Sequence, residues 1–347
     1  MSEKIKYQIH ATNIYGLGAI NVAEKIINGL IKKDNEQIEK VFLSESLNIV
    51  KFKHKKKFAR NLPNTISRLI EIYFAKIYFK NINTLILGDI PLYGISKQIV
   101  FVHQPNLISP RVNEFSSRSL KFKLLRRIFY FNLKFVSKII VQTDYMKEDL
   151  ISSYGNKLPE IFVKKLPPIS DYKNQILFNK KVDNLKLKFF YPSSFYKHKN
   201  HDFLFELNKL KDKKFEIYLT LDQKDFERFQ NLSYVKNLGI LSHENTLKFL
   251  SKSDGLLFLS NLESFGLPLV EAMQLKKPII AIKRNYSKWM CEGYAYYFSD
   301  KKTFELSINQ LRKDYADGRL LKSNMALKKF DKNWDEIIED ISKIIEN

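Results

Sequence analysis

Two glutamates, Glu263 and Glu271, flank a glycine and a proline where an apolar run ends. The run 256–259 has the length and composition of a buried parallel strand, and Pro268 suits the first turn of a following helix. A loop with Gly266 before that helix exposes backbone N–H groups at the positive end of the helix dipole, which favours a phosphate. Carboxylates beside it suit ligand hydroxyls, so the segment indicates a sugar-nucleotide site. A strand, a Gly-Pro turn and a helix also occur in α/β proteins of any function.

The segment 263–273 resembles the E-x7-E signature of the large retaining glycosyltransferase family known as group 1 or family 4. The whole string Glu-Ser-Phe-Gly-Leu-Pro-Leu-Val-Glu-Ala-Met is present. The resemblance implies a GT-B fold in which Glu263 positions the sugar hydroxyls and Glu271 binds the ribose diol. It also implies three donor-binding residues at the start of the helix: Phe265, Gly266 and Leu267.

A basic loop follows the first predicted strand of the C-terminal half, and it contains Lys197, His198 and Lys199. A lysine at a strand end beside a helix start is a good partner for a diphosphate. Lys199-Asn200 resembles the family's lysine motif, which binds the donor pyrophosphate. The family often has an arginine five residues earlier, where this chain has Ser194. We therefore expect Lys199, helped by Lys197 or His198, to carry more of the phosphate charge.

His103 follows the predicted strand 98–102. Ligands of open α/β sheets bind beyond the carboxyl ends of the strands, so His103 lies where chemistry is expected. A lone histidine is more often structural, but the V-x-V-H strand end resembles the family's position for a histidine that faces the transferred sugar. His103 and Glu263 are therefore the predicted catalytic residues.

Gly16 and Gly18 lie in a predicted loop, 13–21, between a first strand at 5–9 and a helix at 22–31. A Gly-x-Gly loop also occurs in dinucleotide-binding proteins, but Asn21 occupies the third glycine position and no clear acidic residue ends a second strand. A dehydrogenase is therefore disfavoured. In the family the corresponding loop approaches the donor phosphates, and both glycines resemble it. A simple tight turn explains them equally well.

The length of 347 residues exceeds what one hydrophobic core usually supports, so two domains are expected. A segment rich in proline at 158–176 is the expected connection. We predict an α/β protein with two Rossmann-like domains facing each other across a cleft. The N-terminal domain, 1–165, would bind the acceptor and the second, 166–330, the sugar nucleotide. The last helix, 331–347, is expected to cross back to the first domain.

The positive charge is concentrated in the N-terminal half. The formal net charge is +22, and residues 1–170 contain 28 Lys and Arg against 13 Asp and Glu. Two stretches, 51–79 and 118–135, combine cations with aromatic side chains at helical spacing, which suits an anionic membrane surface. The alternative is that the apolar stripes pack on the sheet and the lysines are solvated. Nucleic acid is the competing polyanion, but no recognised binding motif is present, and none is predicted as a partner.

The chain has one cysteine, Cys291, which excludes an internal disulfide and fits a reducing compartment. The first ten residues are charged and lack the apolar length of a signal peptide. No run of about 18 apolar residues is present. We expect a cytoplasmic protein that is peripheral on the inner face of the cytoplasmic membrane.

The predicted reaction is retaining transfer of a sugar from a nucleoside diphosphate sugar to a glycan. The acceptor is expected to be a lipid-linked saccharide in the synthesis of a bacterial surface polysaccharide: O-antigen, capsule or lipopolysaccharide. The sequence lacks the Asp-x-Asp loop of metal-dependent transferases, so no metal or other cofactor is predicted. The alternatives are a sugar-nucleotide epimerase of the same fold and a non-catalytic subunit that binds sugar nucleotide or glycan.

Overall fold

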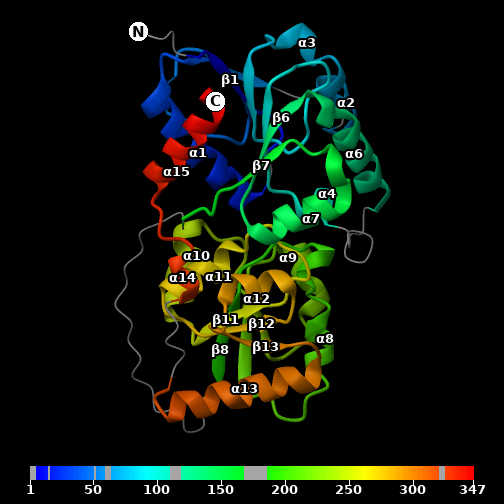
Figure 1. The fold of residues 1–347 in the computed structure, drawn as a ribbon. Helices are drawn as coiled ribbons and strands as arrows, with labels where there is room; N and C mark the ends of the chain where they lie inside the picture. The colour runs from blue at the N-terminus through cyan, green and yellow to red at the C-terminus, as the bar shows by residue number, and fades with distance from the viewer. Residues whose placement is uncertain are drawn as a thin grey trace. The chain divides into compact units, whose positions relative to one another are not determined.

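The computed structural model describes residues 5–14, 16–50, 52–58, 64–109, 119–167, 186–319 and 325–347. These residues form two compact α/β units (Figure 1). The first contains the described residues up to 167 together with 330–347, and the second contains those from 186 to 329. The chain thus leaves the first unit after 167 and returns to it at Phe330, near the predicted boundaries at 165 and 330.

A seven-stranded parallel sheet forms the centre of the first unit, in the order β3-β2-β1-β4-β5-β6-β7. Its strands are β1 (Tyr7–Ala11), β2 (Ile38–Ser44), β3 (Lys55–Phe58), β4 (Asn83–Ile86), β5 (Gln98–Val102), β6 (Val136–Val141) and β7 (Glu160–Val163). Every residue of β1 and β5 is buried, as expected for parallel strands with both faces covered. The strands run parallel, so the loops after β1, β4 and β5 lie at one edge of this sheet.

Seven helices belong to the described part of the first unit: α1 (Leu17–Asp34), α2 (Asn64–Tyr73), α3 (Ala75–Tyr78), α4 (Pro105–Ile108), α6 (Ser119–Asn132), α7 (Asp144–Tyr154) and α15 (Trp334–Glu346). Two 3-10 turns, Leu133–Phe135 and Gly155–Lys157, follow α6 and α7.

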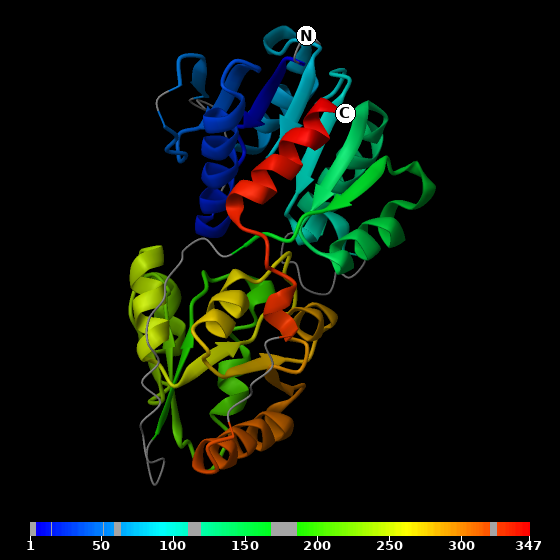
Figure 2. The ribbon, with the colours of Figure 1, turned by 60° about the vertical axis from the view of Figure 1, so that its left-hand side comes forward.

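The C-terminal helix α15 packs against α1 and β4, and Figure 2 shows it along the first sheet. A Cβ added at Gly29 of α1 would lie 2.5 Å from Cγ1 of Ile338. Lys33 pairs with Glu339, and Lys138 donates a hydrogen bond of 2.8 Å to the carbonyl of Ile344. The helix predicted for 331–347 is thus an integral part of the first unit.

A six-stranded parallel sheet forms the second unit, in the order β10-β9-β8-β11-β12-β13. The strands are β8 (Leu187–Tyr191), β9 (Phe215–Leu219), β10 (Val235–Asn237), β11 (Gly255–Phe258), β12 (Ile279–Ile282) and β13 (Ala295–Phe298). The helices are α8 (Phe203–Leu207), α9 (Gln223–Phe226), α10 (His243–Lys252), α11 (Leu267–Gln274), α12 (Asn285–Cys291), α13 (Lys301–Ala316) and α14 (Met325–Lys328), with 3-10 turns at Lys197–Lys199 and Glu227–Phe229. The central strands β11 and β12 are fully buried.

Two local predictions in the first unit are wrong. Helix α1 begins at Leu17 and not at residue 22, because the positive φ of Gly16 (87°) ends the loop directly before the helix. The stretch 58–79 is not one helix: Lys55–Phe58 pairs with β2, and a non-helical residue, Phe74, separates α2 from α3. The predicted basic cluster 51–57 therefore includes an edge strand. Residue 51 and residues 59–63 lie outside the described residues.

Candidate functional site

Lys199 and Glu263 meet at the carboxyl edge of the second sheet. Lys199 Nζ donates a hydrogen bond of 2.5 Å to Glu263 Oε1, and the two side chains are 19% and 11% exposed. Lys199 ends the turn after β8 and Glu263 lies in the loop after β11, and these strands are neighbours in the sheet. The sheet order therefore brings together a cation suited to a diphosphate and a carboxylate suited to a sugar.

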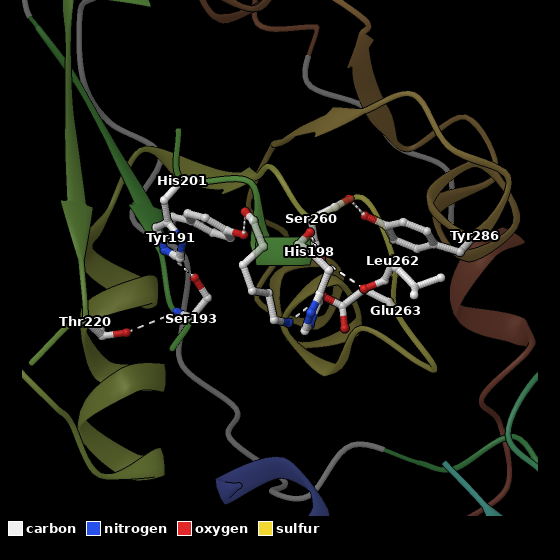
Figure 3. Close-up of polar contacts among 10 residues, drawn as sticks. Tyr191, Ser193, His198, His201, Thr220, Ser260, Leu262, Glu263 and Tyr286 are labelled. Atoms are coloured by element: carbon white, nitrogen blue, oxygen red, sulfur yellow. Dashed lines mark hydrogen bonds and ion pairs between the residues drawn. The ribbon is translucent and has the colours of Figure 1, made fainter. Parts of the chain in front are cut away.

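The main chain around Lys199 is held by hydrogen bonds from β8 and from the loop that carries Glu263, and Figure 3 shows Ser260 of that loop beside His198. The Tyr191 hydroxyl donates to the Lys199 carbonyl at 2.5 Å, and burial raises the pKa of Tyr191 well above 10, so the hydroxyl remains a donor. The Asn261 N–H donates to the His198 carbonyl at 2.6 Å. Asn200 adopts a left-handed conformation (φ 56°), which asparagine tolerates. The position of Lys199 is thus fixed both by β8 and by the loop after β11.

The histidines beside Lys199 are neutral at pH 7. Burial, with the Lys199 charge as the next cause, lowers the pKa of His198 to about 4 and that of His201 to about 3. His201 Nε2 lies 3.0 Å from Ser193 Oγ, which makes it a buried structural contact. Ser194 is exposed. The positive charge beside Glu263 therefore comes from Lys199, and His198 does not add to it.

The loop after β11 enters α11 through Gly266, whose φ of 77° and ψ of 53° are left-handed. An added Cβ would lie 3.2 Å from Leu269 Cδ1, so both conformation and space favour glycine. Phe265 is buried with 2% of its surface exposed, so a donor would reach only its main chain. The predicted residues 265–267 therefore offer main-chain groups at the start of a helix, and their contact with a donor stays a prediction.

Two residues that follow β12 form hydrogen bonds with the loop that carries Glu263. The Arg284 guanidinium donates to Asn261 Oδ1, at 3.1 Å from Nε and 2.6 Å from Nη2. The Tyr286 hydroxyl donates to the Ser260 carbonyl (Figure 3). These contacts orient the loop that carries Glu263, and the sequence analysis assigned no role to Arg284 or Tyr286.

Glu271 of α11 is paired with His243, the first residue of α10. His243 Nε2 lies 2.7 Å from Glu271 Oε1, and Glu271 is 5% exposed. The hydrogen bond to Glu271 raises the pKa of His243 above its usual 6.5. No role was predicted for His243 from the sequence, although it follows β10 in the chain much as His103 follows β5.

A hollow of about 790 Å³ lies along the edge strand β10, and all three residues of that strand line it. Its walls include Asp222 at the start of α9, Asn237 and the segment 238–240. His243 follows that segment by three residues and contacts Glu271. The chain therefore leads directly from the wall of the hollow to the partner of Glu271.

In the first unit, His103 is held by Asp89 from the loop after β4. The backbone N–H groups of His103 and Gln104 donate to Asp89 Oδ1 at 2.7 and 2.9 Å, and His103 Nε2 lies 3.5 Å from Asp89 Oδ2. Asp89 has a φ of 67°, an uncommon conformation that aspartate tolerates better than most residues. Asp89 is thus a positioning partner of His103 that was not predicted from the sequence.

Gly16 and Gly18 lie at the carboxyl edge of the first sheet, after β1. Gly16 precedes α1 with no side-chain cap, and Gly18 is the second residue of that helix and not part of a loop. β4 lies between β1 and β5, so these glycines and His103 share one sheet edge. Their predicted contact with a donor stays a prediction.

No group of three or more His, Cys, Asp or Glu side chains suited to a metal is found within the described ranges. Helices there are also too short or too polar for a bilayer-spanning segment.

A sequence model of the family described as glycosyl transferases group 1 matches residues 173–347, half of the chain. The chain belongs to this family. The match includes Lys199, Glu263 and Glu271, so the predicted membership of the group 1 family is confirmed. A relative named as an uncharacterized glycosyltransferase of Methanocaldococcus jannaschii is 26% identical over 225 residues, and the match spans 60% of this chain and 59% of the relative.

Solved structures share the fold of this group 1 protein. HepE of Anabaena in complex with UDP and glucose superposes with a TM-score of 0.66 at 16% identity, covering 98% of this chain and 99% of that one. Sucrose-phosphate synthase of Thermosynechococcus elongatus gives 0.70 at 14% identity, covering 98% of each chain. WaaG, a glycosyltransferase involved in lipopolysaccharide biosynthesis, gives 0.62 at 12% identity, covering 98% and 99%. The predicted α/β fold of the GT-B class, with two Rossmann-like domains, is confirmed.

Proposed function

We propose that this protein is a retaining glycosyltransferase of family 4 that moves a sugar from a nucleoside diphosphate sugar to a glycan. The observation that carries the proposal is the Lys199–Glu263 pair beside the start of α11. A diphosphate needs a cation and backbone N–H donors, and a sugar needs a fixed carboxylate. The E-x7-E segment supplies these groups together with Lys199. The complex of HepE with UDP and glucose supports such a donor.

In the proposed reaction the C–O bond between the anomeric carbon and the diphosphate breaks, and the acceptor oxygen forms the new bond on the same face. Negative charge grows on the leaving diphosphate while the sugar becomes oxocarbenium-like. Lys199 and the N-terminus of α11 stabilise that charge, and no cofactor or metal is included in the proposal. When Lys199 turns to the diphosphate, Glu263 is released to accept hydrogen bonds from sugar hydroxyls.

We assign the nucleoside part of the donor to the second unit, next to Glu271. Glu271 would bind the ribose diol, with His243 orienting its carboxylate from 2.7 Å. The hollow beside Asn237 and Gly239 is the candidate site for the base. Gly16 and Gly18 are kept in the proposal as donor-binding residues.

The acceptor is assigned to the carboxyl edge of the first sheet, where His103 would face the transferred sugar. Asp89 orients His103 there. We propose a lipid-linked saccharide of a bacterial surface polysaccharide as the acceptor and a peripheral place on the inner face of the cytoplasmic membrane. The role of WaaG in lipopolysaccharide biosynthesis supports this class of acceptor.

The first experiment is a thermal-shift panel of UDP-, GDP-, TDP- and ADP-sugars, each with and without EDTA. We expect stabilisation by sugars of one nucleotide and no effect of EDTA. The stabilising donor is then incubated with lipid-linked glycan extracts, with Glu263→Gln as the inactive variant and Glu206→Gln, from an exposed helix surface, as the control.

The anomeric configuration of the product, read by NMR, tests retention. Conversion of the donor without an acceptor would replace the proposal with an epimerase. Donor binding without any turnover across acceptors would favour a non-catalytic subunit.

A further inference from the structure

Helices α2 and α3 expose a stripe of large apolar side chains. Ile66, Ile70, Phe74 and Ile77 recur at spacings of three and four residues, and 52%, 40%, 54% and 70% of their surfaces are exposed. The opposite side of the same helices is buried, since Ile72 and Ala75 belong to the core of the first unit. An exposed apolar stripe on a helix whose other face is already packed indicates a partner surface.

Helix α6 has a second stripe of the same kind. Leu120, Leu124 and Phe131 are 80%, 47% and 66% exposed, while Leu125, Ile128 and Phe129 are buried in the same core that holds Ile72 and Ala75. The exposed Lys123 and Arg127 lie among the apolar residues of the stripe. Both stripes thus belong to helices that cover one hydrophobic core.

Aromatic contacts join the two stripes. The ring of Tyr73 at the end of α2 lies 5.8 Å from that of Tyr93, and Tyr93 lies 5.2 Å from Phe135, just after α6. The Lys134 ammonium lies over both Tyr93 and Phe135, at 5.7 and 5.0 Å from the ring centres. The exposed faces of α2, α3 and α6 therefore form one surface, which we name the basic aromatic surface.

The charge of this surface has one sign. The sequence from 115 to 143 contains no aspartate or glutamate, and Glu71 is the sole acidic residue from 64 to 80. Glu71 points away from the surface, because its carboxylate contacts His10 at 2.9 Å and Thr12 at 2.5 Å, at the carboxyl end of β1. Aromatic and aliphatic side chains among cations, without acids, match the interface of an anionic bilayer.

The inner face of α2 reaches the carboxyl edge of the first sheet. Glu71 contacts His10 and Thr12 at the end of β1, and the Arg68 guanidinium donates to the Gly88 carbonyl after β4 at 3.3 Å. Gly88 directly precedes Asp89, which holds His103. One helix therefore connects the basic aromatic surface with the proposed acceptor edge.

We propose that the basic aromatic surface docks on the headgroup region of an anionic lipid bilayer and places the acceptor edge beside it. The docking part of the proposal rests on the exposed apolar side chains and the positive charge of the basic aromatic surface. The delivery of a lipid-linked acceptor from that bilayer rests on the proposed function. Apolar side chains enter the headgroup boundary, and Lys123, Arg127 and Lys134 pair with anionic lipids.

Vesicle flotation tests the docking with the full chain and no sugar substrate. We expect the protein to float with vesicles of phosphatidylcholine and phosphatidylglycerol, not with phosphatidylcholine alone, and to be released by salt. Ile70→Ser with Phe74→Ser and Ile77→Ser should reduce the bound fraction about tenfold. The matched control, Val50→Ser with Ile151→Ser and Leu306→Ser, removes equally exposed apolar residues elsewhere and should bind normally.

A charge variant provides a second test. Lys123→Glu with Arg127→Glu should lower binding to anionic vesicles, whereas Lys211→Glu with Lys248→Glu in the second unit should not. Unchanged thermal unfolding would show that the variants are folded. No binding of the wild type to anionic vesicles, or equal loss in surface and control variants, overturns the docking.

Vesicle binding by a protein that transfers no sugar would support the docking and reject the proposed function. Binding to a protein partner without any vesicle binding would replace the bilayer as the occupant of this surface.

Discussion

Lys199 Nζ and Glu263 Oε1, from the loops after two neighbouring strands, form a hydrogen-bonded ion pair 2.5 Å long. Each side chain neutralises the other in a partly buried position. The proposed donor needs both groups separately, the ammonium for its diphosphate and the carboxylate for its sugar. Donor binding must therefore exchange this internal pair for two contacts with the ligand.

The exchange predicts that Glu263→Gln separates binding from transfer. The neutral amide holds Lys199 less strongly than the carboxylate does, so the variant should bind the nucleoside diphosphate at least as tightly as the wild type. Transfer should fall by about a hundredfold or more, because a transition-state contact is lost. Calorimetry with the nucleoside diphosphate and turnover with the full donor measure the two effects. Weaker binding of the nucleoside diphosphate would contradict the competition.

The His243–Glu271 pair predicts a pH-dependent stability. The pKa of His243 is raised above 6.5 in the folded protein, so the contribution of the pair is fully present below pH 6.5 and is lost as the pH rises through the folded pKa. The difference in Tm between the wild type and His243→Gln should be largest in acid and shrink toward alkaline pH. Thermal unfolding across a pH series measures it. In a Glu271→Gln background this pH dependence should disappear.

We predict that substitution of Gly266 destabilises the protein, for two reasons. Alanine at φ 77° costs about 1–2 kcal/mol in any left-handed position, and here its Cβ would also press on Leu269 at 3.2 Å. We expect Gly266→Ala to lower the free energy of unfolding by about 2–3 kcal/mol and to weaken donor binding.

Gly318→Ala is the matched control, since Gly318 has a φ of 65° and no atom within 4 Å of an added Cβ. Chemical denaturation compares the two variants. Equal destabilisation would show that the contact with Leu269 is relieved without cost.

We predict that Asp89 positions both the main chain and the imidazole ring of His103. Asp89→Ala removes the acceptor of two backbone N–H groups and should destabilise the protein by about 1–3 kcal/mol. Asp89→Asn retains an acceptor oxygen and tolerates the positive φ, so its stability should stay close to that of the wild type. Its turnover should nevertheless fall, because the carboxylate that orients the ring near Nε2 is lost. Unchanged turnover would restrict Asp89 to a structural role.

The contact between α1 and α15 predicts an unusual glycine effect. Alanine normally stabilises a helix interior by about 1 kcal/mol over glycine. Gly29→Ala should instead destabilise by about 1–3 kcal/mol, because the added Cβ would lie 2.5 Å from Ile338 Cγ1. In an Ile338→Ala background the same change should become favourable. The double-mutant cycle is measured by denaturant unfolding, and additive effects would refute the close packing.

Much of the second unit could be predicted from local sequence. The predicted strand 256–259 corresponds to β11 at Gly255–Phe258, and the helix with Pro268 is α11. Such elements depend on a hydrophobic run and on Gly and Pro signals within a few residues. The strand β2 (Ile38–Ser44) and the edge strand β3 were not predicted. Lys55–Lys57 resembles a solvated basic segment, and only the pairing with β2 makes it a strand.

The sequence by itself determined the family, the two-domain α/β class, and the groups at the strand ends: Lys199, Glu263, Glu271 and His103. These follow from residue types and spacings that the chain carries locally. Only the tertiary structure decided which of those groups are partners. The order β10-β9-β8-β11 joins Lys199 to Glu263 across 64 positions, and the packing of α10 and α11 joins His243 to Glu271 across 28. Such pairings arise from the order in which strands assemble, which no local pattern encodes.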